Sequence, residues 1–317
     1  MNSLPSLTLR SLGLPLLVLG MSGAGSAADL YWDANGATTT ATGGTAVWNT
    51  ASTWRDSSAT GTLQNWADGN AAVFGGTAGT VTLSSSVSVS QLKLTTTSYI
   101  VGATTDTTNS ISFSGSYSDS VRAIDGNVAN ATIRAKITGT INGGLVVFNG
   151  SNITAPGSAG RLSIENTAND FVGDITVLGG NLSANSAAMG ATANKVILRG
   201  GALFVSNGAG TNTTTFNRNI AVDASSGIGT TVASSGIQTL ELSGVITGSA
   251  NLTRYASLTG TGAASKVVLS GDMSGYSGIF NNMAGDVVVQ TSAASAGKWV
   301  LGGPSGSRGG ACGSRRQ

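Results

Sequence analysis

Histidine is absent from the 317-residue chain, and the single cysteine is Cys312. Without histidine the chain lacks the side chain that most often exchanges protons near neutral pH and most often binds transition metals. A lone cysteine excludes a disulfide within the chain and a cysteine-based metal site. Serine and threonine are plentiful, but no histidine is present to activate them as nucleophiles. We therefore expect no cofactor, no metal centre and no catalytic activity.

Charged residues are also scarce, at 9% of the chain, and aromatic residues make up 5%. The formal net charge is +2, but Arg10, Arg308, Arg315 and Arg316 lie near the two ends. Without these four, 12 of the 16 basic residues remain against 14 acidic ones. The body of the chain therefore has no basic face for nucleic acid. Because 40% of the residues are hydrophobic, simple disorder is not expected either.

Residues 1–28 have the pattern of a secretory signal peptide. Arg10 supplies the positive charge, and residues 12–21 form an apolar stretch too short to span a bilayer. Small residues precede a cleavage site after Ala27 or Ala28. The sequence thus predicts a bacterial protein that is secreted or held at the cell surface, with no integral membrane segment after cleavage. A membrane anchor is the alternative interpretation.

The abundant residues are glycine, with 47 copies, together with serine, threonine, asparagine and alanine. Apolar and small polar residues alternate in short runs, which is the period-two pattern of strands with one buried face. Glycine or asparagine interrupts nearly all of them, as expected for turns. The runs are residues 80–94, 110–118, 131–141, 173–184, 195–206, 218–223, 239–248, 266–271 and 286–290.

A weak internal repeat accompanies these runs. Residues 162–175 resemble residues 267–280, and residues 136–145 resemble residues 245–254. Repeated strands joined by turns of variable length are typical of a solenoid, in which each coil buries its alternate residues against the next. We therefore predict an all-β fold, a parallel β-helix. A tandem β-sandwich is the alternative.

Two parts of the chain resemble a known family. "WDANG" at 32–36 and "WADGNAAVFGG" at 66–76 are similar to the opening module of bacterial autotransporter-associated β-strand-repeat proteins. "LSGVITGSANLTR" at 242–254 resembles the passenger repeat of that family, with Arg254 where the repeat often carries lysine. The likeness is specific over residues 31–103 and looser downstream.

The resemblance implies a right-handed β-helical passenger region exposed at the cell surface, with adhesion as its use. Passengers of this kind often continue for several hundred residues and end in an outer-membrane translocation domain or another sorting signal. Residues 301–317 instead change to glycine, serine and arginine. We interpret them as a tail, either disordered or the product of truncation or a frameshift. The expected division is a signal peptide (1–28), a tryptophan-rich cap with the first coils (29–103), a repeat region (104–300) and the tail.

Four of the five tryptophans, Trp32, Trp48, Trp54 and Trp66, fall within a short N-terminal stretch. They have two interpretations. An uncapped solenoid exposes its apolar interior and unpaired strand edges, so the rings would close that end as an aromatic cap. Alternatively, exposed indoles would form a platform for glycans.

Taken together, these features predict a non-enzymatic, secreted or surface-displayed β-helical module for structure or adhesion. Its partners would be extracellular glycans or the surface of a host or neighbouring cell. The alternative is a carbohydrate-binding or polysaccharide-cleaving β-helix, which would need clustered carboxylates. Seven acidic residues of the repeat region are scattered instead, at Asp125, Glu165, Asp170, Asp174, Glu241, Asp272 and Asp286.

A calcium site is a further possibility at the N-terminal end. Asp33, Asn35, Asp68 and Asn70 carry the hard oxygen donors that Ca²⁺ prefers. Their acidic density is low, however, and Asx–Gly pairs are common turn formers. We therefore assign these residues to turns.

Overall fold

The computed structural model describes residues 27–36, 39–103, 106–126, 130–150, 160–207, 211–232, 238–259, 265–283, 285–290 and 299–301. Almost all of the predicted signal peptide and tail lies outside these residues. Within the described ranges the only helix is the single-turn 3-10 helix η1 (Ser186–Met189). The described ranges contain no helix that is long and apolar enough to cross a membrane.

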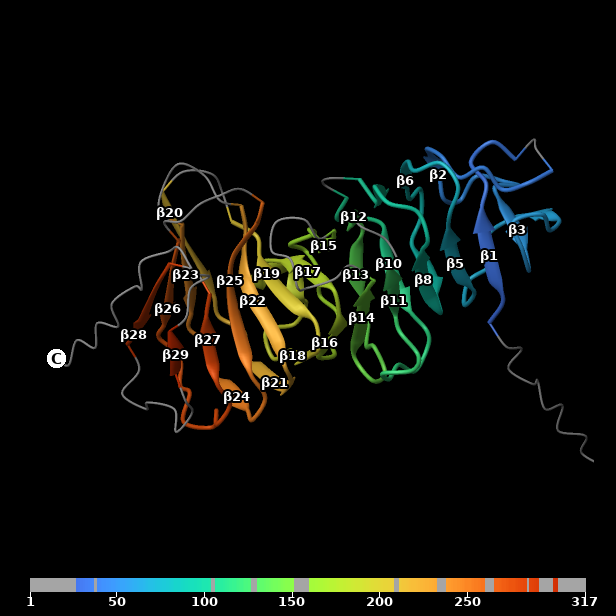
Figure 1. The fold of residues 1–317 in the computed structure, drawn as a ribbon. Helices are drawn as coiled ribbons and strands as arrows, with labels where there is room; N and C mark the ends of the chain where they lie inside the picture. The colour runs from blue at the N-terminus through green and yellow to red at the C-terminus, as the bar shows by residue number, and fades with distance from the viewer. Residues whose placement is uncertain are drawn as a thin grey trace, which may run out of the picture.

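The strands stack along one axis as successive coils, from β1 and β3 at one end to β28 and β29 at the other (Figure 1). They form three faces, which the chain visits in turn. The first face is an 11-stranded sheet of β1 (Asp29–Trp32), β3 (Trp54–Asp56), β4 (Leu63–Gln64), β5 (Ala71–Phe74), β8 (Gln91–Leu94), β11 (Ile124–Gly126), β14 (Leu145–Asn149), β16 (Ile175–Gly179), β18 (Val196–Arg199), β21 (Ile220–Ala224) and β24 (Ile246–Gly248).

The second face is another 11-stranded sheet, and the third face consists of two shorter sheets. The second face contains β2 (Ala46–Val47), β6 (Thr80–Thr82), β9 (Tyr99–Val101), β12 (Asn130–Ile133), β15 (Arg161–Ile164), β17 (Asn181–Ala184), β19 (Ala202–Val205), β22 (Ser226–Val232), β25 (Leu252–Thr259), β27 (Phe280–Asn282) and β29 (Trp299–Leu301). The third face contains β7 (Val87–Val89), β10 (Ser110–Phe113) and β13 (Lys136–Thr138), then β20 (Asn212–Phe216), β23 (Gln238–Leu242), β26 (Ser265–Leu269) and β28 (Asp286–Val289).

Strands of successive coils pair in parallel on every face, as in β5 with β8 and β9 with β12. The antiparallel pairs of the described residues, β1 with β3 and β3 with β4, lie at the N-terminal end. The predicted parallel β-helix is therefore confirmed. The tandem β-sandwich is wrong, because sandwiches are built from antiparallel sheets.

Alternation along each strand places one apolar row of each face in the interior. On the first face, in-register pairing stacks the side chains of successive coils into such a row. The row consists of Leu145, Ile175, Val196, Ile220 and Ile246. Each of these side chains is at most 1% exposed.

All nine alternating runs read from the sequence contain strands of the structure.

The internal repeat does not correspond to equivalent positions in the coils. Leu162 lies on β15 of the second face, whereas its counterpart Val267 lies on β26 of the third. Strands on all faces need the same alternation and similar turns, so segments from different faces come to resemble each other. The repeat predicted the architecture but not its register.

The third face is interrupted between β13 and β20, where polar side chains replace a strand. The Asn169 Oδ1 atom accepts a hydrogen bond from Ile137 N at 2.7 Å, and its Nδ2 atom donates to Ala188 O at 2.8 Å. Asn169 is 6% exposed. One amide side chain thus supplies the acceptor and the donor that a neighbouring strand would provide.

Alkaline pH is expected to destabilise the fold through its buried tyrosines. Burial raises the pKa of Tyr99, Tyr117 and Tyr276 to about 12, whereas an unfolded tyrosine titrates near pH 10. Between these values the unfolded chain loses protons that the folded chain keeps. The stabilisation is therefore complete below about pH 10 and is lost as the pH rises through about 12.

Urea unfolding between pH 8 and 12 checks this expectation. The free energy of unfolding should fall above pH 10, and Tyr99→Phe should reduce the steepness of that fall. A free energy that stays constant up to pH 12 would contradict the assignment of buried, neutral phenols.

Candidate functional site

The four predicted tryptophans meet at the N-terminal end of the solenoid. The centroids of neighbouring indoles lie 4.8–5.0 Å apart. The ring of Phe74, on the next coil, lies 5.3 Å from that of Trp48. All five contacts are tilted or edge-to-face, and aromatic rings prefer such arrangements to face-to-face stacking. The sequence cluster is therefore also a cluster in space.

Burial distinguishes the two interpretations of this cluster. Trp32, Trp48 and Trp54 are at most 1% exposed, while Trp66 is half-buried against the same core. The indole nitrogens of Trp32 and Trp54 donate to Gly44 O and to Trp48 O, each at 2.9 Å. The predicted aromatic cap is thus confirmed. A glycan platform remains a prediction for Trp66 alone, because the other three rings have no open face for a sugar.

The cap also closes the strand edge of the first face. Strand β3 runs antiparallel to β1 and covers its edge, and β4 in turn pairs antiparallel with β3. The guanidinium of Arg55, on β3, forms a buried ion pair with the Asp33 carboxylate at 2.8 Å. Asp33 also accepts a hydrogen bond from the Thr42 hydroxyl at 3.0 Å. This carboxylate therefore serves the packing of the cap.

Two of the other oxygen donors considered for calcium, Asp68 and Asn70, also accept hydrogen bonds from the protein. Asp68 Oδ1 accepts from the Trp66 indole at 2.8 Å and from Ser88 N at 2.9 Å. Asn70 Oδ1 accepts from Ala28 N at 2.9 Å. Across the described ranges, no group of three or more His, Cys, Asp or Glu residues is placed to hold a metal ion.

Six of the seven scattered acidic residues have separate partners in the structure. Each of those with an ion-pair partner has its own cation, at distances of 2.6–3.6 Å. Glu241 instead accepts from the Thr215 and Ser270 hydroxyls, and Asp272 accepts from Ser274. The ion pairs are Asp125 with Arg122, Glu165 with Arg134, Asp170 with Lys136, and Asp174 with Lys195.

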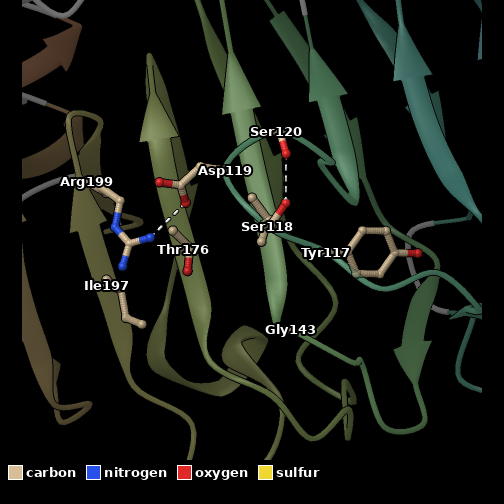
Figure 2. A pocket seen from close by; sticks show the side chains of 9 residues that line it. Tyr117, Ser118, Asp119, Ser120, Gly143, Thr176, Ile197 and Arg199 are labelled. Atoms are coloured by element: carbon tan, nitrogen blue, oxygen red, sulfur yellow. Dashed lines mark hydrogen bonds and ion pairs between the residues drawn. The ribbon is translucent and has the colours of Figure 1, made fainter.

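A second candidate site is a groove on the outer side of the first face, with a volume of about 510 Å³ (Figure 2). Its floor includes Val146, Thr176 and Ile197, which lie opposite one another on β14, β16 and β18. Residues 117–120, between β10 and β11, form the wall. We call this site the outer groove.

The charged groups of the outer groove come from distant parts of the chain. Arg199, at the end of β18, contacts Asp119 of the wall at 2.7 Å and Asp223 of β21 at 2.9 Å. These carboxylates, Asp223 foremost, raise the pKa of Arg199 above its ordinary value through hydrogen bonds. Within the wall, the Ser118 and Ser120 hydroxyls lie 3.0 Å apart. The sequence analysis missed this site, because Asp119 and Arg199 are 80 residues apart.

Gly143 allows the wall to lie close to the turn between β13 and β14. Its φ is +81°, and a Cβ atom there would lie 2.1 Å from Tyr117 O. Gly143→Ala is therefore expected to lower the free energy of unfolding by more than about 1 kcal/mol. Gly69→Ala is the matched control, since Gly69 has a φ of +85° but nothing within 4 Å of its Cβ position.

Urea unfolding of the two variants separates backbone strain from steric contact. Gly69→Ala reports the cost of the positive φ alone, and Gly143→Ala should lose more. Equal losses would show that the wall does not depend on close contact at Gly143.

Comparison with known proteins finds a similar protein. The chain is 39% identical over 206 residues to a protein named "Adhesin BmaC autotransporter" from Brucella suis biovar 1 (strain 1330). The match covers 63% of this chain and 5% of that protein, so the chain spans a small part of its relative's length. No family model matches, and no solved structure matches. The likeness to autotransporter proteins inferred from the motifs is confirmed.

Proposed function

We propose that this chain, which is autotransporter passenger-like, is a non-enzymatic adhesion module displayed at the cell surface or secreted. The observation that carries the proposal is the first face, in which parallel pairing runs from β5 to β24. Each coil contacts its neighbours through paired backbone and stacked apolar side chains, so the solenoid resists bending and local opening. Such a rod projects a binding surface away from its attachment point.

The chemistry of the side chains supports a role without catalysis. The acidic residues considered as catalytic pairs are held separately, in ion pairs or hydrogen bonds of their own. The name of the relative, an adhesin, agrees with this role. Extracellular glycans or the surface of another cell are the proposed partners. The low and balanced charge of the body does not favour nucleic acid.

Cell attachment tests the proposed function. The chain is fused to an outer-membrane translocation domain and displayed on bacteria that do not adhere by themselves. Cells that display it should attach to glycan-coated surfaces or epithelial monolayers in larger numbers than cells that carry the translocation domain alone. Antibody labelling confirms equal display. Equal attachment at equal display would refute an adhesive role.

A further inference from the structure

The outer groove is accessible and has a mixed lining. Its side chains combine apolar surface at Ile197 with the Ser118 and Ser120 hydroxyls and the charged groups of Asp119 and Arg199 (Figure 2). The Asp119 side chain is 58% exposed and that of Arg199 is 39% exposed. Both side chains are therefore accessible to a ligand from solvent. The volume of about 510 Å³ is in the range of small-molecule sites.

The geometry of the floor suits an extended ligand. Thr176, Ile197 and Ala221 form one row across β16, β18 and β21. Thr176 is 5% exposed, so the accessible part of this row is Ile197 and Ala221. Neighbouring strands lie about 4.8 Å apart, a spacing close to the length of one pyranose unit in a saccharide chain. A saccharide lying across β18 and β21 would therefore meet Ile197 and Ala221 with successive rings.

Charge argues against an anionic ligand. Asp119 and Arg199 are the charged residues of the groove lining. The carboxylates of Asp119 and Asp223 already neutralise the guanidinium, at 2.7 and 2.9 Å. A phosphate or uronic acid would meet two carboxylates and a single cation, so like-charge repulsion would oppose its binding.

Backbone pairing argues against a peptide that adds as a strand. Strands β14, β16 and β18 each have a hydrogen-bonded neighbour on both sides. The groove therefore offers side chains and no free strand edge. Its hydroxyl and charged groups would also be poorly paired against a lipid chain. A neutral, polyhydroxylated ligand satisfies both the apolar floor and the polar wall.

We propose that the outer groove binds a neutral saccharide chain. A sugar ring packs on Ile197, while its hydroxyls donate to the Asp119 carboxylate and accept from the Arg199 guanidinium. This inference names a ligand class for the adhesion module and so rests on the proposed function. It assigns binding to the side of the solenoid and not to the tryptophan cap.

Calorimetric titration of the purified chain tests the proposal. The probes are neutral hexasaccharides: hexamers of glucose linked α-1,4, β-1,4 or β-1,3, and chitohexaose. Hexagalacturonate is the anionic comparison. We expect at least one neutral probe to bind and the anionic one not to. Binding of hexagalacturonate alone, or of no neutral probe, would overturn the proposal.

Two substitutions locate the binding. Arg199→Gln should weaken binding at least tenfold, and Ile197→Trp should abolish it by filling the groove. Arg134→Gln is the matched control, because Arg134 forms a similarly exposed ion pair with Glu165 outside the groove lining. It should change affinity less than twofold. Saccharide binding that survives both groove substitutions, or that is lost with Trp66→Ala instead, would contradict the assignment.

The titration and the attachment assay can fail separately. If the chain binds the neutral probe in solution but gives no attachment when displayed, the saccharide site is supported and the adhesive role is refuted. If the Arg199→Gln variant promotes attachment as well as the unsubstituted chain does, the adhesive role is supported and binding at this site is refuted. Thermal unfolding of each variant excludes loss of the fold as the cause.

Discussion

Replacing Trp54 with alanine is expected to lower the free energy of unfolding by about 3–5 kcal/mol, the usual cost of removing a large aromatic side chain from a core. Trp54 is fully buried, and its ring centroid lies 5.0 Å or less from those of Trp32, Trp48 and Trp66. Its indole also donates a hydrogen bond to Trp48 O. The substitution would therefore leave a cavity at the centre of the cap.

The matched control is Trp66→Ala in the same cluster. Trp66 is half-buried at the rim of the cap, so less apolar area returns to water and the expected loss is less than about 2 kcal/mol. Urea unfolding of both variants measures the difference. Equal losses, or a stable Trp54→Ala variant that has lost glycan binding, would favour a binding platform over a cap.

Replacing Arg218 with alanine is the second change with a large expected effect, a loss of about 3 kcal/mol or more if two or three buried acceptors are left without donors. Arg218 is 6% exposed and lies where the third face is interrupted. Its guanidinium donates to Ser186 O at 2.9 and 3.0 Å and to Gly190 O at 2.8 Å, and it also contacts Ala191 O. This side chain thus binds the carbonyls around η1 where a strand is missing.

Arg199→Ala provides the contrast for the second prediction. Arg199 also makes two close polar contacts, but they are exposed ion pairs, which contribute about 1 kcal/mol or less. Thermal and urea unfolding should therefore show a large loss for Arg218→Ala and a small one for Arg199→Ala. The reverse order would mean that the break in the third face is not held by the buried arginine.

Much of the fold could be predicted from the sequence, because alternation and turns repeat along the chain. For example, the alternating run at 195–206 contains both β18 and β19. The cap was also predictable, because an open solenoid end must be covered and the tryptophans gather in the sequence next to it. The resemblance of residues 31–103 pointed to autotransporter proteins, as does the name of the observed match.

Strands without an apolar alternation were missed. Strand β22 has the sequence "SGIGTTV", with glycines where outward side chains would stand. A Cβ atom at Gly227 would lie 2.7 Å from the Tyr255 ring, and one at Gly229 would lie 2.9 Å from the Phe204 ring. The neighbouring strands β19 and β25 thus cover β22 with their own aromatic rings. Tertiary packing replaces the local pattern there, so sequence alternation gave no signal.

The outer groove could not be predicted for a different reason. Its wall and floor meet only because the coils place residues 117–120 beside β14, β16 and β18. Neither Asp119 nor Arg199 lies in a recognisable motif. Their proximity depends on the number of coils between them and on the register of each coil, which turns of variable length conceal.

The measurement that tests the parallel β-helix most directly is disulfide trapping between coils. Ser112 on β10 and Thr138 on β13 are in-register partners on the third face. Neighbouring strands lie about 4.8 Å apart, within the Cα separation that a disulfide spans. Cysteines at both positions, with Cys312→Ser to remove the native thiol, should therefore crosslink on mild oxidation.

The control pair joins Ser112 to Thr132, which is closer in sequence but lies on β12 of the second face. Mass spectrometry of the oxidised, folded variants gives the result. The account predicts a disulfide for the Ser112–Thr138 pair and none for the Ser112–Thr132 pair. Crosslinking of the control pair alone would contradict the parallel solenoid and, with it, the groove and the cap that depend on its register.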